Sequence, residues 1–279
     1  MTTNDNNNGA NVVVAAENPL KQMLLEYVGN KYATEDDEGE FEVTVQMIVD
    51  TLAHEFQQRQ QMLEQSNNFY TPSGIHVYTK DEMMNDLVDL EGVVSKLEST
   101  LPDHLRDGVE MIIIGQFDEF AERDINAFYK DGALYVSNFQ TDNDDLLDDL
   151  IHETAHSVEE QYGMEIYADQ KIKNEFLRKR EHLYNILSKM NLATDKQRFM
   201  DTEYEQEFDE YLFGDVGYDR MSEILKGVVV TPYAMTSLRE YFATAFTEFY
   251  FQPDSHNYIK KVSPELYRKL VMLHQAGDA

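Results

Sequence analysis

The 279-residue chain contains no cysteine. Disulfide bonds are therefore excluded, and the sequence says nothing about the redox state of the compartment in which the protein works. The absence also limits metal binding, because thiolates supply many of the ligands in structural zinc sites. A zinc site in this chain would have to use histidine and carboxylate ligands.

Basic residues are scarce: 23 Lys and Arg stand against 53 Asp and Glu, and the formal net charge is -30. We expect binding neither to nucleic acid nor to anionic membranes, because both depend on Lys and Arg contacts with phosphate. The charge fits a basic peptide substrate or a basic protein partner drawn in by the long-range field. It fits equally well a role in solubility alone.

Long hydrophobic runs are also missing, and no apolar stretch approaches the length of a membrane span. The N-terminus, MTTNDNNNGANVVVAAENP, has no basic region before its brief VVVAA patch and does not resemble a secretory signal. We therefore expect neither a signal peptide nor a transmembrane segment. The predicted location is the cytoplasm, or a target reached by a signal-independent route such as a virion or an effector delivery system.

The composition predicts three regions of unequal size. Residues 1–17 are polar and Asn-rich, which predicts a disordered tail. Residues 18–66 predict two amphipathic helices joined by an acidic loop, a segment that would form a small subdomain or a docking arm. Residues 67–279 predict the main domain, which is long enough to bury a substantial core.

Strand patterns gather in the first half of the predicted main domain, at residues 75–79, 109–117 and 133–138. Asp131 and Gly132 predict a tight turn just before the last of these strands. We expect residues 133–138 to form an edge strand beside an active-site helix. An exposed edge can hold an extended peptide through main-chain hydrogen bonds, although an ordinary internal strand would show the same pattern.

Helical periodicity dominates the rest of the main domain. A capping box at Thr79 and Glu82 predicts a helix that continues to Leu101. A helix is also expected around residues 150–158, with capping residues at positions 141–145, and further helices are expected near residues 168–190, 237–251 and 263–275. The predicted fold class is α+β, with a small sheet packed on one central helix and a mostly helical C-terminal half.

Residues 150–156 read LIHETAH, which matches the pattern H-E-x-x-H. On a helix, His152 and His156 lie one turn apart on the same face and can direct two imidazoles at one metal ion. Glu153 lies beside that face and can reach a water activated by the metal without being a ligand itself. The bare pattern is short, but the uncharged residues around the histidines indicate a buried helix, as a zinc site requires.

A catalytic zinc ion takes three protein ligands, so one more is needed. A third histidine within H-E-x-x-H-x-x-G-x-x-H is excluded, because Glu159 and Tyr162 occupy the Gly and His positions. The remaining option is a glutamate on a later helix. The best candidate is Glu240, in the segment 237–250 that also contains Glu248 and has a strongly apolar side.

Together with HETAH, the downstream block YAMTSLREYFATAF at residues 233–246 resembles the catalytic domain of the anthrax toxin lethal factor family of zinc metallopeptidases, which are of the gluzincin type. Members of that family have a tyrosine seven residues before the ligand glutamate and then a pattern close to E-F-F-A-E-A-F. Tyr233 and Glu240 keep that interval. The resemblance covers roughly residues 100–275, and nothing in residues 1–66 contributes to it.

The resemblance implies a zincin-like domain with one Zn²⁺ bound by His152, His156 and Glu240. It also implies that Glu153 is the general base and that Tyr233 donates a hydrogen bond to the oxyanion. The sequence departs from the family at Thr244, where a second glutamate often stands. Threonine cannot supply a carboxylate to orient a ligand histidine, so Asp149 or a backbone carbonyl would have to take that part.

The predicted function is zinc-dependent endopeptidase activity on a peptide or protein substrate, by Glu153-assisted attack of a zinc-activated water on the peptide bond. The alternative is a non-catalytic structural or interaction protein, for example a virion-associated one, that keeps a peptidase fold. Thr244, the extra N-terminal segment and the charge motivate that alternative. The sequence leaves the oligomeric state open.

Overall fold

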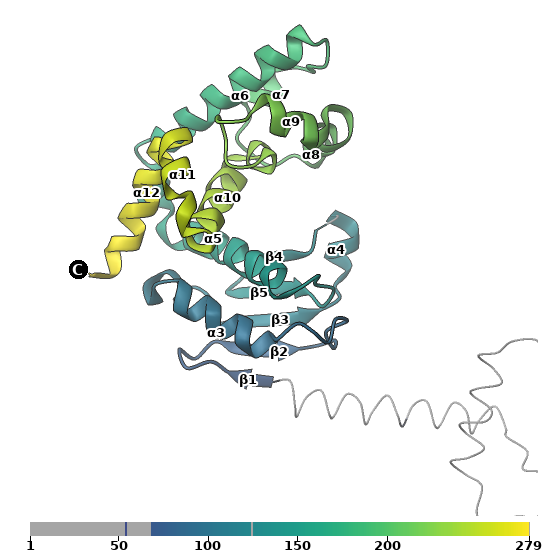
Figure 1. Ribbon diagram of the computed structural model, residues 1–279, viewed down its shortest axis with the longest axis vertical. Helices are drawn as coiled ribbons and strands as arrows, with labels where there is room; N and C mark the ends of the chain where they lie inside the picture. The colour runs from purple at the N-terminus through teal and green to yellow at the C-terminus, as the bar shows by residue number, and fades with distance from the viewer. Residues whose placement is uncertain (1–53, 55–67, 124, 279) are drawn as a thin grey trace, which may run out of the picture. The chain divides into compact units, whose positions relative to one another are not determined.

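The computed structural model describes residues 54, 68–123 and 125–278 (Figure 1). The chain divides into two units, Met1–Met62 and Leu63–Ala279, and the sheet and helices named here belong to the second. The predicted disordered tail of residues 1–17 lies outside the described residues. The predicted helical segment of residues 18–66 lies outside them too, apart from His54.

Within the described residues, the strands form one five-stranded sheet in the order β1-β2-β3-β5-β4. They are β1 (Asn68–Tyr70), β2 (His76–Thr79), β3 (Met111–Gly115), β4 (Ala127–Lys130) and β5 (Ala133–Ser137). The three central strands β2, β3 and β5 run parallel, and β1 and β4 pair antiparallel at the two edges. The three strands predicted from the sequence are confirmed, and they are the three central ones.

The prediction of an edge strand at residues 133–138 is wrong. β5 pairs with β3 on one side and with β4 on the other, and the edge belongs to β4. The turn at Asp131 and Gly132 forms as expected, and both residues have positive φ angles of 49° and 82°. The sequence does not predict β4, the first strand of this hairpin, because β4 has only four residues and one of its ends is charged.

The helix predicted to begin at Thr79 begins eleven residues later, as α3 (Leu90–Thr100). Its cap is Asp89, whose side chain accepts a backbone N–H from the first turn. The intervening segment is held to the end of β5 instead, because Met84 donates its backbone N–H to the Asn138 carbonyl, 3.0 Å away. The amide of Asn138 in turn donates to a carbonyl of the same segment. This tertiary bonding overrides the local helical pattern.

The long helix α5 (Asn143–Tyr167) packs against the strands β4 and β5 of the sheet and against the helix α3. Asp142 caps it and accepts two backbone N–H groups of the first turn. Its apolar face is at most 1% exposed, and this face comprises Leu146, Leu147, Leu150, Ile151, Ala155 and Val158. The helix is interrupted at Tyr162, where φ is -111° and ψ is 20°, and then continues for a further turn.

Helices make up most of the remainder. They are α4 (Asp118–Arg123), α6 (Lys171–Lys189), α7 (Lys196–Met200), α8 (Gln206–Glu210), the π-helix Tyr211–Gly217, α9 (Tyr218–Ile224), α10 (Leu238–Phe251), α11 (His256–Val262) and α12 (Pro264–Gln275). The expected helices at residues 168–190, 237–251 and 263–275 correspond to α6, α10 and α12. The mixed α+β fold class is therefore confirmed.

The two helices that matter most for the site are α5 and α10, which lie against one another (Figure 1). Phe242, Ala243 and Phe246 of α10 are fully buried. Among the described residues, none of the helices is both long enough and apolar enough to cross a membrane.

Candidate metal centre

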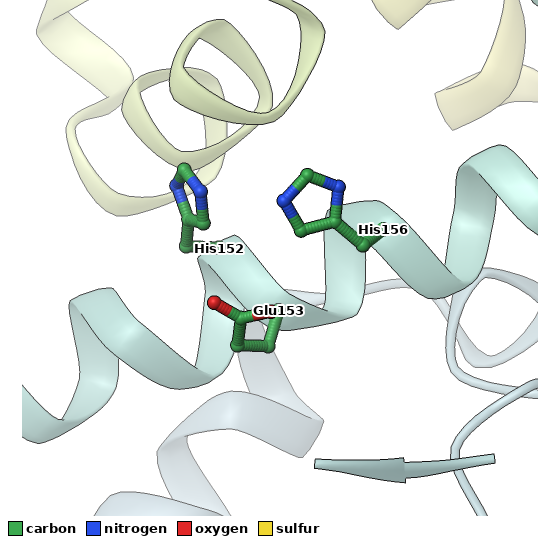
Figure 2. Close-up of side chains that lie close together, drawn as sticks. All are labelled: His152, Glu153 and His156. Carbon is green, nitrogen blue, oxygen red and sulfur yellow. The ribbon is translucent and has the colours of Figure 1, made fainter. Parts of the chain in front are cut away.

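Three chemically active side chains project from the middle of α5. His152, Glu153 and His156 each offer a ligand atom, and these atoms all lie within 4.8 Å of one another. Figure 2 shows the two imidazole rings on the same side of the helix, one turn apart. Four residues advance an α-helix by slightly more than one turn, which places both rings over the same patch of surface.

A carboxylate reaches this group from α10. Glu240 Oε2 lies 3.0 Å from His152 Nε2, and Glu240 Oε1 lies 3.4 Å from His156 Nε2. The three side chains are largely buried, with exposed fractions of 18% for His152, 12% for His156 and 13% for Glu240. The structure thus brings together the three residues that the sequence predicts as ligands, although 88 positions separate Glu240 from His152.

The start of α10 fixes the position of Glu240. Ser237 caps the helix, and its hydroxyl accepts the backbone N–H of Glu240 at 3.1 Å. The preceding carbonyls of Met235 and Thr236 accept hydrogen bonds from Arg180, which is 1% exposed. The guanidinium of Arg180 also binds carbonyls in residues 198–201. One buried cation therefore ties the chain before α10 to α6.

The outer nitrogens of the two histidines have separate partners. His156 Nδ1 lies 2.8 Å from Glu159 Oε2, and His152 Nδ1 lies 3.4 Å from Thr247 Oγ1. Both Nε2 atoms are therefore the ones that face Glu240. Sequence reasoning missed Glu159 as a partner, although its spacing of three from His156 places it on the same helix face.

Neither Thr244 nor Asp149 is shown to bond to the two histidines. Thr244 is buried, and its hydroxyl has no hydrogen-bond partner among the described residues. Asp149, the predicted substitute, accepts a hydrogen bond from Gln140 at 3.0 Å. The carboxylate that lies at the outer nitrogen, Nδ1, of a candidate ligand histidine belongs to Glu159 instead.

The charges in the cluster are strongly coupled. Burial disfavours a charged imidazole, but the hydrogen bond and charge of Glu240 outweigh it and raise the pKa of His152. For His156, the hydrogen bonds with Glu159 and Glu240 likewise outweigh burial and raise the pKa to about 10. Burial works against ionisation of Glu240, yet its hydrogen bonds with both histidines lower its pKa. A cation that binds here must displace protons from the imidazoles.

Glu153 behaves differently from Glu240. Burial is the largest influence and raises the pKa of Glu153, and the nearby charge of Glu240 acts in the same direction, against the two histidines. A carboxyl with a raised pKa is better suited to accept and return a proton than an ordinary glutamate.

A cavity of about 170 Å³ opens over these residues. Its lining includes Ile125, Ala127, Phe128 and Tyr129 of the β4 segment, and Tyr204, Tyr233, Ser237 and Arg239 from later in the chain. The ring of Tyr233 has its centroid 6.3 Å from that of His152. Burial first, and the charge of Glu240 second, raise the pKa of Tyr233, which keeps its hydroxyl protonated as a hydrogen-bond donor.

Residues of β4 at the edge of the sheet line this cavity, and some of their backbone groups point away from β5. The Ser137 N–H donates to the Asn126 carbonyl at 2.7 Å, so Asn126 directs its backbone groups toward β5. Because bonding direction alternates along an antiparallel strand, Ala127 and Tyr129 direct their backbone groups toward the open edge. The Tyr129 N–H meets Glu153 there and lowers its pKa in opposition to burial.

The donor set matches what a catalytic zinc ion takes. Two imidazole nitrogens and one carboxylate oxygen make three protein ligands, and the cavity above them leaves room for a water or a substrate. The outer partners of the histidines are also of the kind that orients zinc ligands. The side chains present therefore fit a mononuclear zinc site.

No protein-family model, no curated protein and no solved structure matches this chain.

Proposed function

We propose that this protein is a zinc-dependent metalloendopeptidase. One observation carries the proposal: a carboxylate from α10 meets two imidazoles from α5 directly beside the buried carboxyl of Glu153. Three potential ligands and an adjacent acid or base are the parts that hydrolysis of a peptide bond requires.

In this proposal His152, His156 and Glu240 hold one Zn²⁺. Bound there, zinc supplies Lewis-acid chemistry, which activates water near neutral pH and polarises the scissile carbonyl. The hydrogen bonds of the histidine Nδ1 atoms to Glu159 and Thr247 keep the Nε2 atoms aimed at the site.

Glu153 acts as the general base and then as the general acid. It takes the proton of the attacking water and passes it to the nitrogen of the leaving amine, so that the carboxyl returns to its starting state. Its burial and raised pKa support this role. Tyr233 lines the same cavity as a protonated phenol, and it donates a hydrogen bond to the oxygen that gains negative charge.

The substrate lies along β4 in an extended conformation. The outward N–H and carbonyl of Ala127 and the outward carbonyl of Tyr129 offer the hydrogen bonds of strand addition, while the Tyr129 N–H is bound to Glu153. Main-chain pairing of this kind binds peptides of varied sequence, and the side chains that line the cavity select among them. The formal charge of -30 favours basic peptides.

The fold is consistent with a zincin-like domain of the lethal factor-like, gluzincin type. A small mixed sheet ends in an antiparallel edge strand, and that strand lies beside the helix bearing H-E-x-x-H. The alternative remains a non-catalytic protein that keeps such a fold. The two proposals differ in whether the zinc-loaded protein hydrolyses peptides.

The test has two stages. Metal analysis of the purified full chain should find about one zinc per chain, lost in His156→Ala. The zinc-loaded protein is then incubated with a peptide library that contains basic, neutral and acidic members, alongside the isosteric variant Glu153→Gln. Cleavage by the wild type and not by Glu153→Gln supports the peptidase. A folded, zinc-loaded wild type that cleaves nothing, or a Glu153→Gln variant that cleaves equally well, contradicts it.

A further inference from the structure

Glu159 is the most heavily engaged acidic side chain near the site. Only 4% of its side chain is exposed. One carboxylate oxygen lies 2.8 Å from His156 Nδ1 and 3.3 Å from Arg239 Nε, and the other accepts a hydrogen bond from the Tyr167 hydroxyl. A buried carboxylate is costly unless it is paired in this way, so the three partners stabilise its charge.

The three partners come from different places. His156 lies on the same face of α5, Tyr167 is at the end of that helix, and Arg239 precedes Glu240 on α10. Residues eight apart on a straight helix are separated by about 12 Å along its axis. The Tyr167 ring covers this distance because helical side chains lean toward the N-terminus and because α5 is interrupted at Tyr162.

We infer that Glu159 is a positioning residue for the metal centre, through which His156 and the start of α10 are held in ligating geometry. This inference rests on the proposed zinc site. An acceptor at Nδ1 fixes the imidazole tautomer and leaves the Nε2 lone pair directed at the ion. The same carboxylate, through Arg239, ties α5 to the residue that adjoins the third ligand.

This arrangement explains how the site is supported without an acid at position 244. The hydroxyl of Thr244 has no hydrogen-bond partner among the described residues, so it contributes nothing to either histidine. Thr247 offers His152 only a longer contact of 3.4 Å. The strong, charged support is therefore concentrated on His156 and comes from the helix that carries it.

The experiment compares three substitutions in the full-length chain. Glu159→Gln keeps the length and an acceptor oxygen for Nδ1, whereas Glu159→Met keeps the length and removes the acceptor. Glu165→Gln is the matched control, because it removes one negative charge from an exposed position on the same helix. Zinc affinity is measured by competition with a chromogenic chelator, and folding of each metal-free variant is checked by thermal unfolding.

We expect Glu159→Met to weaken zinc binding by about 10- to 100-fold, with Glu159→Gln closer to wild type and Glu165→Gln within about twofold of it. The Co²⁺-substituted Glu159→Met protein should also show an altered visible absorption band, because the ligand field depends on ring orientation. Wild-type zinc affinity and an unchanged cobalt spectrum in folded Glu159→Met would overturn the inference about Glu159 and leave the proposed function standing. A wild type that binds no zinc would overturn the proposed function as well, which separates the two failures.

Discussion

The carboxylate of Glu240 lies 3.0 Å from Nε2 of His152, across the contact between α10 and α5. Nothing local in the chain forces this approach, since the two residues are 88 positions apart. The cap at Ser237 and the buried guanidinium of Arg180 set where α10 begins, and that starting point places the first-turn glutamate over the histidines.

Replacement of Glu240 by alanine should therefore abolish the site and leave the fold intact. Loss of an orienting partner costs about 10- to 100-fold in metal affinity, so loss of one of three ligands should cost at least about 100-fold. Chelator competition measures the loss. Glu248→Gln, a change on the same helix, is the control and should retain wild-type affinity. Equal affinities in the two variants would remove Glu240 from the ligand set.

Replacement of Tyr233 by phenylalanine should separate catalysis from metal binding. The ring still fills its place in the cavity wall, but the hydroxyl donor is lost. Removal of a single oxyanion donor lowers kcat by about 100- to 1000-fold in other hydrolases. We expect a loss of that order in peptide cleavage by the zinc-loaded variant, with zinc affinity unchanged. A variant with wild-type kcat would show that Tyr233 only packs.

The sequence was sufficient where one local pattern decides the structure. The apolar periodicity around HETAH and the cap at Asp142 specify α5, and the alternating runs specify the three central strands. The spacing between Tyr233 and Glu240 led to a residue that does lie beside the two histidines.

The sequence was insufficient where contacts between residues far apart in the chain determine the local structure. The segment before α3 has a helical pattern, but Asn138 holds it in another conformation through bonds that no local window contains. β4 is an edge strand only because β5 lies between it and β3. Glu159 was considered only as the wrong residue for a third-histidine motif, and its role depends on Tyr167 and Arg239.

Asp149 should make stability depend on pH. Burial, the largest influence, raises its pKa to about 7 in the folded protein, against an ordinary value of 3.8. The folded state therefore binds the proton more tightly, and this contribution to stability is full below about pH 4 and lost as the pH rises through 7. Asparagine at this position keeps an acceptor for Gln140 and removes the titration.

We therefore expect Asp149→Asn to gain about 2–3 kcal/mol of unfolding free energy, relative to wild type, between pH 5 and pH 8. Urea denaturation of the metal-free proteins at both pH values measures the gain. Asp86→Asn, at an exposed position, controls for the change in net charge. A difference between Asp149→Asn and wild type that is the same at both pH values would show that this carboxyl does not titrate between them.

The open edge of β4 gives the sharpest test of how the substrate binds. Ala127→Pro removes an N–H that points away from β5, and proline is tolerated at such edge positions because no sheet hydrogen bond is lost. Thermal unfolding and zinc affinity should therefore stay near wild type. The substrate loses one main-chain hydrogen bond and meets the proline ring, so kcat/KM for extended peptides should fall by about tenfold or more. An unchanged kcat/KM in the folded, zinc-loaded variant would mean that peptides reach the site without pairing with this strand.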